Sequence, residues 1–188
     1  MRPRWKSSVE ELPWLYAVAM SGIPTSHRGG VHAHVHDAPG FVAAVEAACA
    51  QRGLRLTASR REVLRLIAAH GQPAKAYELL EQLRMRHASA APPTIYRALD
   101  FLVRNGFIHR LDSINAFVTC HHPEQAHQVP ILICDSCQHA EEVCDDGRVA
   151  RLIVAQAEQR GFVPSAQTLE VHGLCRRCSA ANARSVTP

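Results

Sequence analysis

The chain has 188 residues, of which 47% are hydrophobic and 20% are charged, and its net charge at pH 7 is +4. This length suits one large or two small domains with proper cores, and no run approaches the roughly 20 apolar residues of a membrane span. The apolar stretch 12–20 is too short to span a membrane, and it lacks the convincing cleavage site that a signal peptide would have.

Cysteine usage indicates a reducing compartment. The chain has seven cysteines, and four of them form two C-x-x-C pairs. An odd count at these spacings suits metal thiolates better than a disulfide framework. We therefore expect a cytoplasmic protein.

The charge is distributed unevenly. Residues 41–104 hold ten Lys/Arg and five Asp/Glu, a balance of +5, whereas residues 105–188 hold seven and nine, a balance of −2. Such asymmetry is typical of a protein in which one domain faces phosphate. A solvent-exposed surface on which charges are unevenly distributed by chance would have the same charge balances. Charge alone therefore does not decide between the two interpretations.

Residues 1–38 are expected to form a flexible N-terminal tail. They contain Pro, Gly and Ser and show no lasting periodicity. The triplet His32, His34 and His36 has a spacing that can bind metal loosely. We interpret the segment as an unstructured leader.

Beyond the tail, apolar residues at helical spacing and the N-cap residue Thr57 predict a helical domain. Its four helices are expected after Asp37–Pro39 up to Gly53, from Thr57 to Gly71, from Lys75 to His87 and, after a loop with Pro92 and Pro93, from Ile95 to Asn105. Two strands follow at 107–111 and 116–120, joined by the turn 112–115. Helices followed by a β-hairpin predict a winged helix-turn-helix domain over 39–121.

The second half is predicted to be a small α/β dimerisation domain over 122–180, followed by a C-terminal tail over 181–188. Its strands are expected at 130–134, 139–144 and 165–172, with a helix over 148–160. Such strands can pair between two copies of the chain. The fold class of the whole chain is therefore expected to be α+β.

The two C-x-x-C pairs predict a structural zinc site. Cys134 with Cys137, and Cys175 with Cys178, each place two thiolates on one tight turn. Four thiolates complete a tetrahedral site with no open position, which makes the site structural rather than catalytic. A redox dithiol is the alternative for one such pair, but two pairs favour zinc.

Further ligand types lie around the junction of the two halves. They are His109, Cys120, His121, His122, His127, Glu141, Glu142 and Cys144. Mixed nitrogen, sulfur and oxygen ligands also suit zinc. Spacing alone does not name the members of a second site.

The start of the fourth helix carries residues suited to DNA. Hydroxyls such as those of Thr94 and Tyr96 bond phosphate at a helix N-terminus. Arg97 lies one turn in, where a guanidinium reaches guanine O6 and N7. The alternative is that Tyr96 packs in the core and that Arg97 is only a solvent-exposed charge.

These motifs together resemble the ferric uptake regulator family. The resemblance is carried by LTASRREVL (56–64), AYELL (76–80), PPTIYRALDFL (92–102) and the two C-x-x-C pairs, and it covers about 41–178. Within the family the chain is similar to the branch of zinc uptake regulators, in ALDFL (98–102) and HGLCRRC (172–178). The iron-sensing branch typically carries an H-H-D-H run where this chain has His127 followed by Gln-Val-Pro.

The resemblance implies roles for individual residues. The implied regulatory zinc ligands are His109, Cys120, His127 and Glu142, and the structural ligands are the four paired cysteines. The implied base-reading residues are Tyr77 and Arg97. Apart from the resemblance, we expect Arg60, Thr94 and Tyr96 to be further DNA contacts. Glu81 and Arg84 are implied to link neighbouring dimers on DNA, although opposite charges at i, i+3 also make intrahelical pairs.

The hypothesis that follows is a zinc-responsive transcriptional repressor. It would hold two zinc ions per chain and bind double-stranded operator DNA as a homodimer, with two dimers per operator, to repress zinc-uptake genes. The alternative within the family is sensing of iron, manganese or nickel, against which the Cys120 thiolate argues. An enzyme is not expected, because the sequence has no H-E-x-x-H helix, nucleophile elbow or phosphate loop. A zinc buffer without DNA binding is disfavoured by the basic first half.

Overall fold

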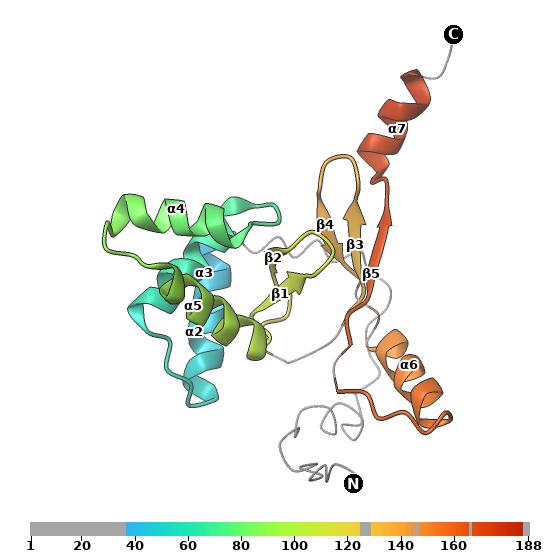
Figure 1. Cartoon of the computed structure of the whole chain (residues 1–188), viewed down its shortest axis with the longest axis horizontal. Helices are drawn as coiled ribbons and strands as arrows, with labels where there is room; N and C mark the ends of the chain where they lie inside the picture. The colour runs from blue at the N-terminus through green and yellow to red at the C-terminus, as the bar shows by residue number, and fades with distance from the viewer. Residues whose placement is uncertain (1–36, 125–128, 144, 146, 166, 186–188) are drawn as a thin grey trace, which may run out of the picture. The chain divides into compact units, whose positions relative to one another are not determined.

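The computed structural model describes residues 37–124, 129–143, 145, 147–165 and 167–185. Its elements in chain order are α2 (Ala38–Gln51), α3 (Ala58–His70), α4 (Ala76–Arg86), α5 (Pro92–Arg104), β1 (Ile108–Leu111), β2 (Ala116–Thr119), β3 (Ile131–Cys134), β4 (Ala140–Glu142), α6 (Arg148–Glu158), β5 (Glu170–Gly173) and α7 (Arg176–Ser185) (Figure 1). The expected fold class, α+β, is confirmed. The histidine triplet of the tail lies outside the described residues, as do His127 and Cys144. No helix in the described ranges is long and apolar enough to cross a membrane.

The first helices begin and end at the residues that the sequence indicates. The Asp37 carboxylate accepts a hydrogen bond from the Gly40 amide at the start of α2, and the Thr57 hydroxyl accepts one from the Arg60 amide at the start of α3. Gly71 ends α3 with φ +65°, a left-handed conformation that costs glycine little. The predictions of these helices are confirmed.

The start of α5 differs from the prediction. Pro92 and Pro93 were expected in a loop before Thr94, but they are the first two residues of the helix. Proline is tolerated there because the first-turn amides have no partner within the helix and its fixed φ already suits a helix. The first turn of α5 therefore begins two residues before Thr94.

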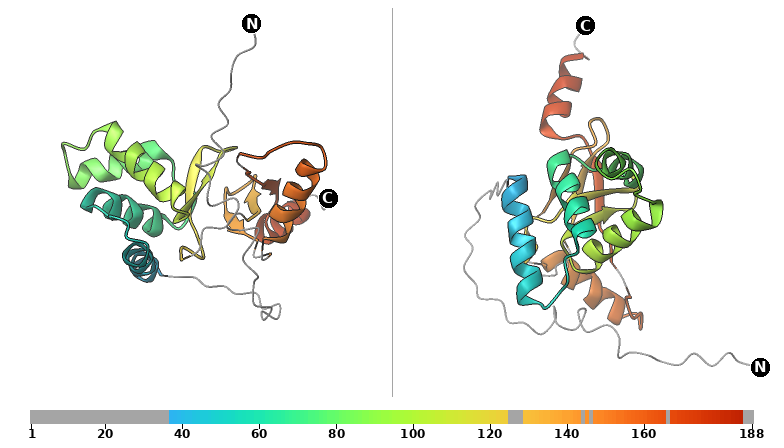
Figure 2. Two further views of the ribbon diagram at one scale, coloured as in Figure 1. Left: turned by 90° about the horizontal axis from the view of Figure 1, so that it is seen from below. Right: turned by 90° about the vertical axis from the view of Figure 1, so that its left-hand side faces the viewer.

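The helices α2 to α5 share one apolar core. Figure 2 shows these helices from two further sides, gathered beside the β1–β2 hairpin. The most deeply buried side chains of this core include Val45, Leu64, Leu79, Leu102 and Phe107. Cys49 is buried in the same core, as its place on the apolar face of α2 predicts.

The β1–β2 hairpin is antiparallel, with Ile108 paired to Thr119 and Leu111 paired to Ala116. Its turn comprises residues 112–115, which we call the wing turn. An isolated bridge between Ala74 and Phe117 ties the hairpin to the segment before α4. Helices followed by this hairpin form the expected winged arrangement.

The second half contains a three-stranded sheet in the order β4-β3-β5. Strand β3 pairs antiparallel with β4 and parallel with β5. The last strand begins at Glu170, so the expectation of a strand from 165 was too long. The helix α7 was not predicted, because its sequence is polar and falls partly in the expected tail.

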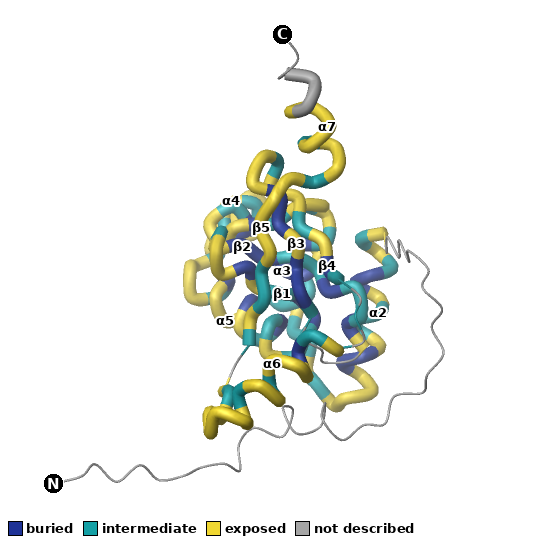
Figure 3. Tube along the Cα trace, turned by 90° about the vertical axis from the view of Figure 1, so that its right-hand side faces the viewer, coloured by how far each residue is buried: buried dark blue, intermediate teal, exposed yellow. Residues whose placement is uncertain are grey.

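A small second core lies between the hairpin and this sheet. Leu111 of β1 is buried together with Ile131 and Ile133 of β3, and Ile114 and Val118 pack against them. Figure 3 shows buried residues within the helices and along β3, whereas α6 and α7 are largely exposed. The hairpin thus belongs to both cores.

Candidate metal and DNA-binding sites

The four paired cysteines lie together. Cys134 ends β3 and Cys137 lies in the turn after it, while Cys175 follows β5 and Cys178 is in the first turn of α7. Their four sulfur atoms lie within 4.8 Å of one another, and the sulfurs of Cys137 and Cys175 are 3.8 Å apart. With Zn–S bonds of about 2.3 Å, the edge of a tetrahedron is about 3.8 Å. The cluster therefore has the size of a four-thiolate zinc site.

The electrostatics of this cluster favour the thiolate form at Cys134 and Cys137 and disfavour it at Cys178. Backbone amides, above all that of Cys175 at 3.3 Å from the sulfur, lower the pKa of Cys134 to about 6. The Ser136 hydroxyl lowers the pKa of Cys178, but the neighbouring thiols and burial outweigh it and raise that pKa to about 11. Backbone amides thus favour the thiolate at Cys134, and the His139 amide lowers the pKa of Cys137 as well.

Arg177 belongs to the surroundings of this cluster and was not anticipated from the sequence. Its hydrogen bond to Cys137, and the negative charge of the sulfurs, raise its pKa above the ordinary value. A guanidinium beside a four-thiolate site offsets part of its net negative charge. Its position between Cys175 and Cys178 is the sequence feature from which this role could have been predicted.

A second group joins the hairpin to the sheet. Ligand atoms of His109, Cys120 and Glu142 all lie within 4.8 Å of one another. Cys120 is fully buried after β2, and the His109 Nε2 is 2.9 Å from the Glu142 Oε1. Imidazole, thiolate and carboxylate at these separations are a donor set that fits zinc.

The Glu142 carboxylate is held in place from the hairpin side. Its side chain is 3% exposed, and its two oxygens accept hydrogen bonds from the His121 amide at 3.1 and 3.2 Å. Glu141, also a candidate, is exposed on the opposite face of β4. The structure thus brings together three of the four ligands implied by the resemblance, and the fourth, His127, lies outside the described residues.

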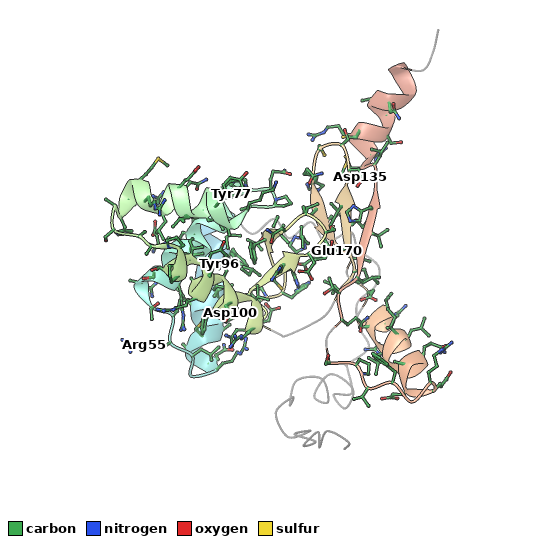
Figure 4. The ribbon with its side chains drawn as sticks, in the orientation of Figure 1. Arg55, Tyr77, Tyr96, Asp100, Asp135 and Glu170 are labelled. Atoms are coloured by element: carbon green, nitrogen blue, oxygen red, sulfur yellow. The ribbon has the colours of Figure 1, made fainter. Side chains whose placement is uncertain are left out.

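The expected DNA contacts lie at the starts of helices. Tyr77 is in the first turn of α4 and is 57% exposed, and Tyr96 in α5 is 60% exposed (Figure 4). Arg97 is also exposed, whereas Thr94 is half-buried. Tyr77 lies within the first turn of α4, where the partial positive charge of a helix N-terminus favours phosphate, whereas Tyr96 and Arg97 lie in the second turn of α5 and offer exposed side chains.

Arg60, the fifth expected contact, is engaged within the domain. Its guanidinium carbon lies 3.6 Å from the centroid of the Phe101 ring, and the group donates a hydrogen bond of 2.7 Å to the Arg55 carbonyl. Such stacking fixes the direction of the charge while leaving its other donors available.

Comparison with known proteins identifies the family. The model of the ferric uptake regulator family matches residues 51–172, well over half of the chain. The chain belongs to the ferric uptake regulator family. This is a family of transcription regulators, so the chain is not an enzyme.

Several relatives within the family carry zinc in their names. The chain is 42% identical over 139 residues to the "Zinc uptake regulation protein" of Escherichia coli K12, covering 73% of this chain and 81% of the relative. It is 30% identical over 146 residues to the "Ferric uptake regulation protein" of Synechococcus elongatus, covering 72% and 93%. The resemblance inferred from the motifs is therefore confirmed.

Two solved structures are similar in fold and sequence. One is described as the crystal structure of holo XcZur, with a TM-score of 0.70 and 60% identity over 74% of this chain and 97% of that one. The other is a zinc uptake regulator complexed with zinc and DNA, with a TM-score of 0.73 and 41% identity over 78% and 97%. Both support the winged-helix interpretation of this family member.

The expected pair Glu81 and Arg84 is not an intrahelical ion pair. Among the described residues, no ion pair joins them, and the Arg84 Nε donates a hydrogen bond of 3.2 Å to the Ala90 carbonyl. Glu81 is exposed on α4. Glu81 and Arg84 therefore do not form an ion pair with each other within the chain.

Proposed function

We propose that this chain is a zinc-responsive transcriptional repressor that binds operator DNA when loaded with zinc and represses zinc-uptake genes. One observation carries the proposal: His109 and Cys120 of the hairpin lie within ligand distance of Glu142 of the sheet. An ion held there contacts both the DNA-binding half and the second half. The naming of the relatives as zinc uptake regulators, one of them solved with zinc and DNA, supports it.

The regulatory site acts through the arrangement of these two halves. When bound, zinc supplies bonds that tie the hairpin to the sheet, and it shifts the balance of arrangements only by its differential affinity for them. His109 and Cys120 move with the winged domain, whereas Glu142 belongs to the sheet. Because the ligands come from both halves, the ion has a higher affinity for the arrangement that brings these ligands together.

Zinc is the proposed signal rather than iron, manganese or nickel. A buried thiolate such as Cys120 suits zinc better than harder ions. We place two zinc ions on each chain, one regulatory with His127 as the fourth ligand, and one structural on the four paired cysteines. Zinc content and operator affinity of protein loaded with each metal distinguish zinc from the alternatives.

The second half is proposed to form a homodimer. Leu132 and Val171 are 43% and 47% exposed on the outer face of the sheet, and Leu152, Phe162 and Val163 of the α6 region are 62%, 65% and 83% exposed. A second copy of the chain buries such apolar surface. We assign dimerisation to residues 122–180 and DNA binding to residues 39–121, in a cytoplasmic protein.

On DNA, the exposed starts of α4 and α5 are proposed to face the duplex. Tyr77 and Arg97 read bases, while Arg60, Thr94 and Tyr96 contact the backbone. Two dimers per operator are proposed to meet through Glu81 of one dimer and Arg84 of another.

Replacement of the buried thiolate tests the proposal. Cys120→Ser should fold and keep one tight zinc per chain but lose zinc-dependent binding to a palindromic operator in a gel shift. His109→Ala should behave in the same way, and His87→Ala, which removes an exposed imidazole outside the site, is the control. Unchanged zinc response in both site variants would refute the proposed regulatory site.

A further inference from the structure

The wing turn is held by a carboxylate of the second half. The Glu170 Oε1 accepts a hydrogen bond of 2.6 Å from the Asp112 amide, and its Oε2 accepts one of 3.1 Å from the Ser113 amide. The Glu170 side chain is 9% exposed. Burial raises the pKa of Glu170, but its hydrogen bonds with Ser113 and Asp112 outweigh this and hold the pKa below its usual range. The carboxylate is therefore ionised at neutral pH.

His172 reinforces this contact from two residues further along β5. Its Nδ1 lies 2.9 Å from the Asp135 Oδ1, and its Nε2 lies 3.0 Å from the Ser113 Oγ. The imidazole thus spans from the turn after β3 to the wing turn. Figure 4 marks Glu170 on β5 and Asp135 beyond the end of β3.

The register of the sheet explains why these side chains meet the wing. Ile131 of β3 pairs with Glu142 on one side and with Glu170 on the other. Side chains that are direct cross-strand neighbours lie on the same face of a sheet. His172 pairs with Ile133, two residues on, and so shares this face.

The face turned to the wing is thus apolar in the middle and charged at both edges. Ile131 and Ile133 pack against Leu111 of the hairpin, and Glu142 and Glu170 lie on the two edge strands, β4 and β5. Glu142 belongs to the candidate regulatory metal site. Glu170 meets the wing turn through hydrogen bonds alone.

We propose that Glu170 and His172 are positioning residues that hold the wing turn on β5 independently of the regulatory metal, an inference that rests on the proposed function for its consequence in DNA binding. We call Glu170, His172 and Asp135 the β5 latch. The regulatory metal then needs to join the hairpin only to β4, because the wing turn is already bound to β5. Losing the latch leaves the wing held at one edge, and the zinc-loaded protein binds its operator less tightly.

Two variants break the latch from opposite sides. Glu170→Gln keeps the shape but leaves one acceptor oxygen for two amides, and Ser113→Ala removes the hydroxyl that meets His172. Glu158→Gln, an exposed position on α6, removes the same charge as the first variant and corrects for the general effect of charge on DNA affinity. Zinc content and sedimentation report whether each variant keeps its structural zinc and its dimer.

Hydrogen exchange tests the latch without DNA or regulatory zinc. With only the structural site loaded, we expect exchange at residues 112–115 to rise about tenfold in Glu170→Gln and about threefold in Ser113→Ala, because charged hydrogen bonds are the stronger kind. The same rise is expected in a Cys120→Ser background. Exchange equal to that of Glu158→Gln, or a rise that disappears with Cys120→Ser, would overturn a metal-independent latch.

Operator affinity tests the positioning role. At saturating zinc we expect Glu170→Gln to bind about tenfold more weakly than Glu158→Gln. Faster exchange with unchanged operator affinity in both latch variants would overturn the positioning role. If the unmodified protein shows no zinc-dependent operator binding, the proposed function fails, and the exchange experiment still decides whether the latch exists.

Discussion

Removal of the proposed structural zinc should unfold the second half of the chain and leave the helices α2 to α5 folded. The reason is the unequal size of the two cores. The first core extends over all four helices, whereas the second buries only Leu111, Ile131 and Ile133 among the described residues. The sheet therefore depends on another source of stability, and the four cysteines lie at the ends of its central and outer strands.

The magnitudes support this order of unfolding. Burial of an aliphatic side chain contributes about 1.5–3 kcal/mol, so these three residues contribute less than the about 10–16 kcal/mol of a structural zinc site. The free energy lost with the ion is comparable to the typical net stability of a whole domain, which is about 5–15 kcal/mol. The winged domain keeps its own core and has no comparable dependence.

Hydrogen exchange with a strong chelator and a reductant present measures the effect. Peptides from 131–173 should lose protection when zinc is withdrawn, while peptides from 41–104 keep it, and added zinc should restore the first set. Loss of protection in both regions together would refute the reasoning from core size. Persistent protection of the sheet after complete removal of zinc would also refute it.

Three further predictions follow from individual side chains. Arg97→Ala should weaken operator binding about ten- to hundredfold, whereas Arg104→Ala at the other end of α5 should cost much less, as fluorescence anisotropy would show. Glu142→Gln should abolish the rise in thermal midpoint caused by the regulatory zinc, which is about 5–10 °C at a hundredfold excess of zinc over its Kd. Without that zinc the thermal midpoint should change much less, because glutamine keeps the shape and one acceptor oxygen for the His121 amide. Zinc binding at pH 7.5 should release a proton from Cys178, whose pKa is about 11, but not from Cys134, whose pKa is about 6. Since the Cys134 pKa lies below its ordinary value, the thiolate contribution is lost as pH falls through about 6, and zinc affinity measured by calorimetry should fall more steeply below that pH.

The winged domain could be predicted from sequence because its signals are local. Caps, helical spacing and terminal glycines gave α2, α3 and α4 within one or two residues of their observed ends. The start of α5 was misplaced because two prolines were interpreted as a loop, although proline suits a first helical turn. Helix α7 was not predicted because its described side chains, 176–182, are mostly exposed, and because it begins within the second C-x-x-C motif.

The candidate sites also divide into residues with a local sequence signal and residues that only strand pairing brings together. The paired cysteines form a local motif, so spacing sufficed to group them. Choosing Glu142 over Glu141 needed either the resemblance or the strand register, because neighbours in a strand face opposite sides. Glu170 and His172 were not singled out, since β5 pairs in parallel with β3 across an intervening helix and the pairing leaves no local signal.

The register of β5 connects the two metal sites. A slip of one residue between β3 and β5 would turn Glu170 and His172 to the outer face and bring Val171 inward. Cys134 pairs with Gly173, and Cys175 follows two residues later, so the observed register brings the two cysteine pairs together. The proposed structural zinc would therefore act on more than the stability of the second half. It would favour the register in which Glu170 and His172 face the wing, and so the proposed structural site would help to position the wing at the proposed regulatory site.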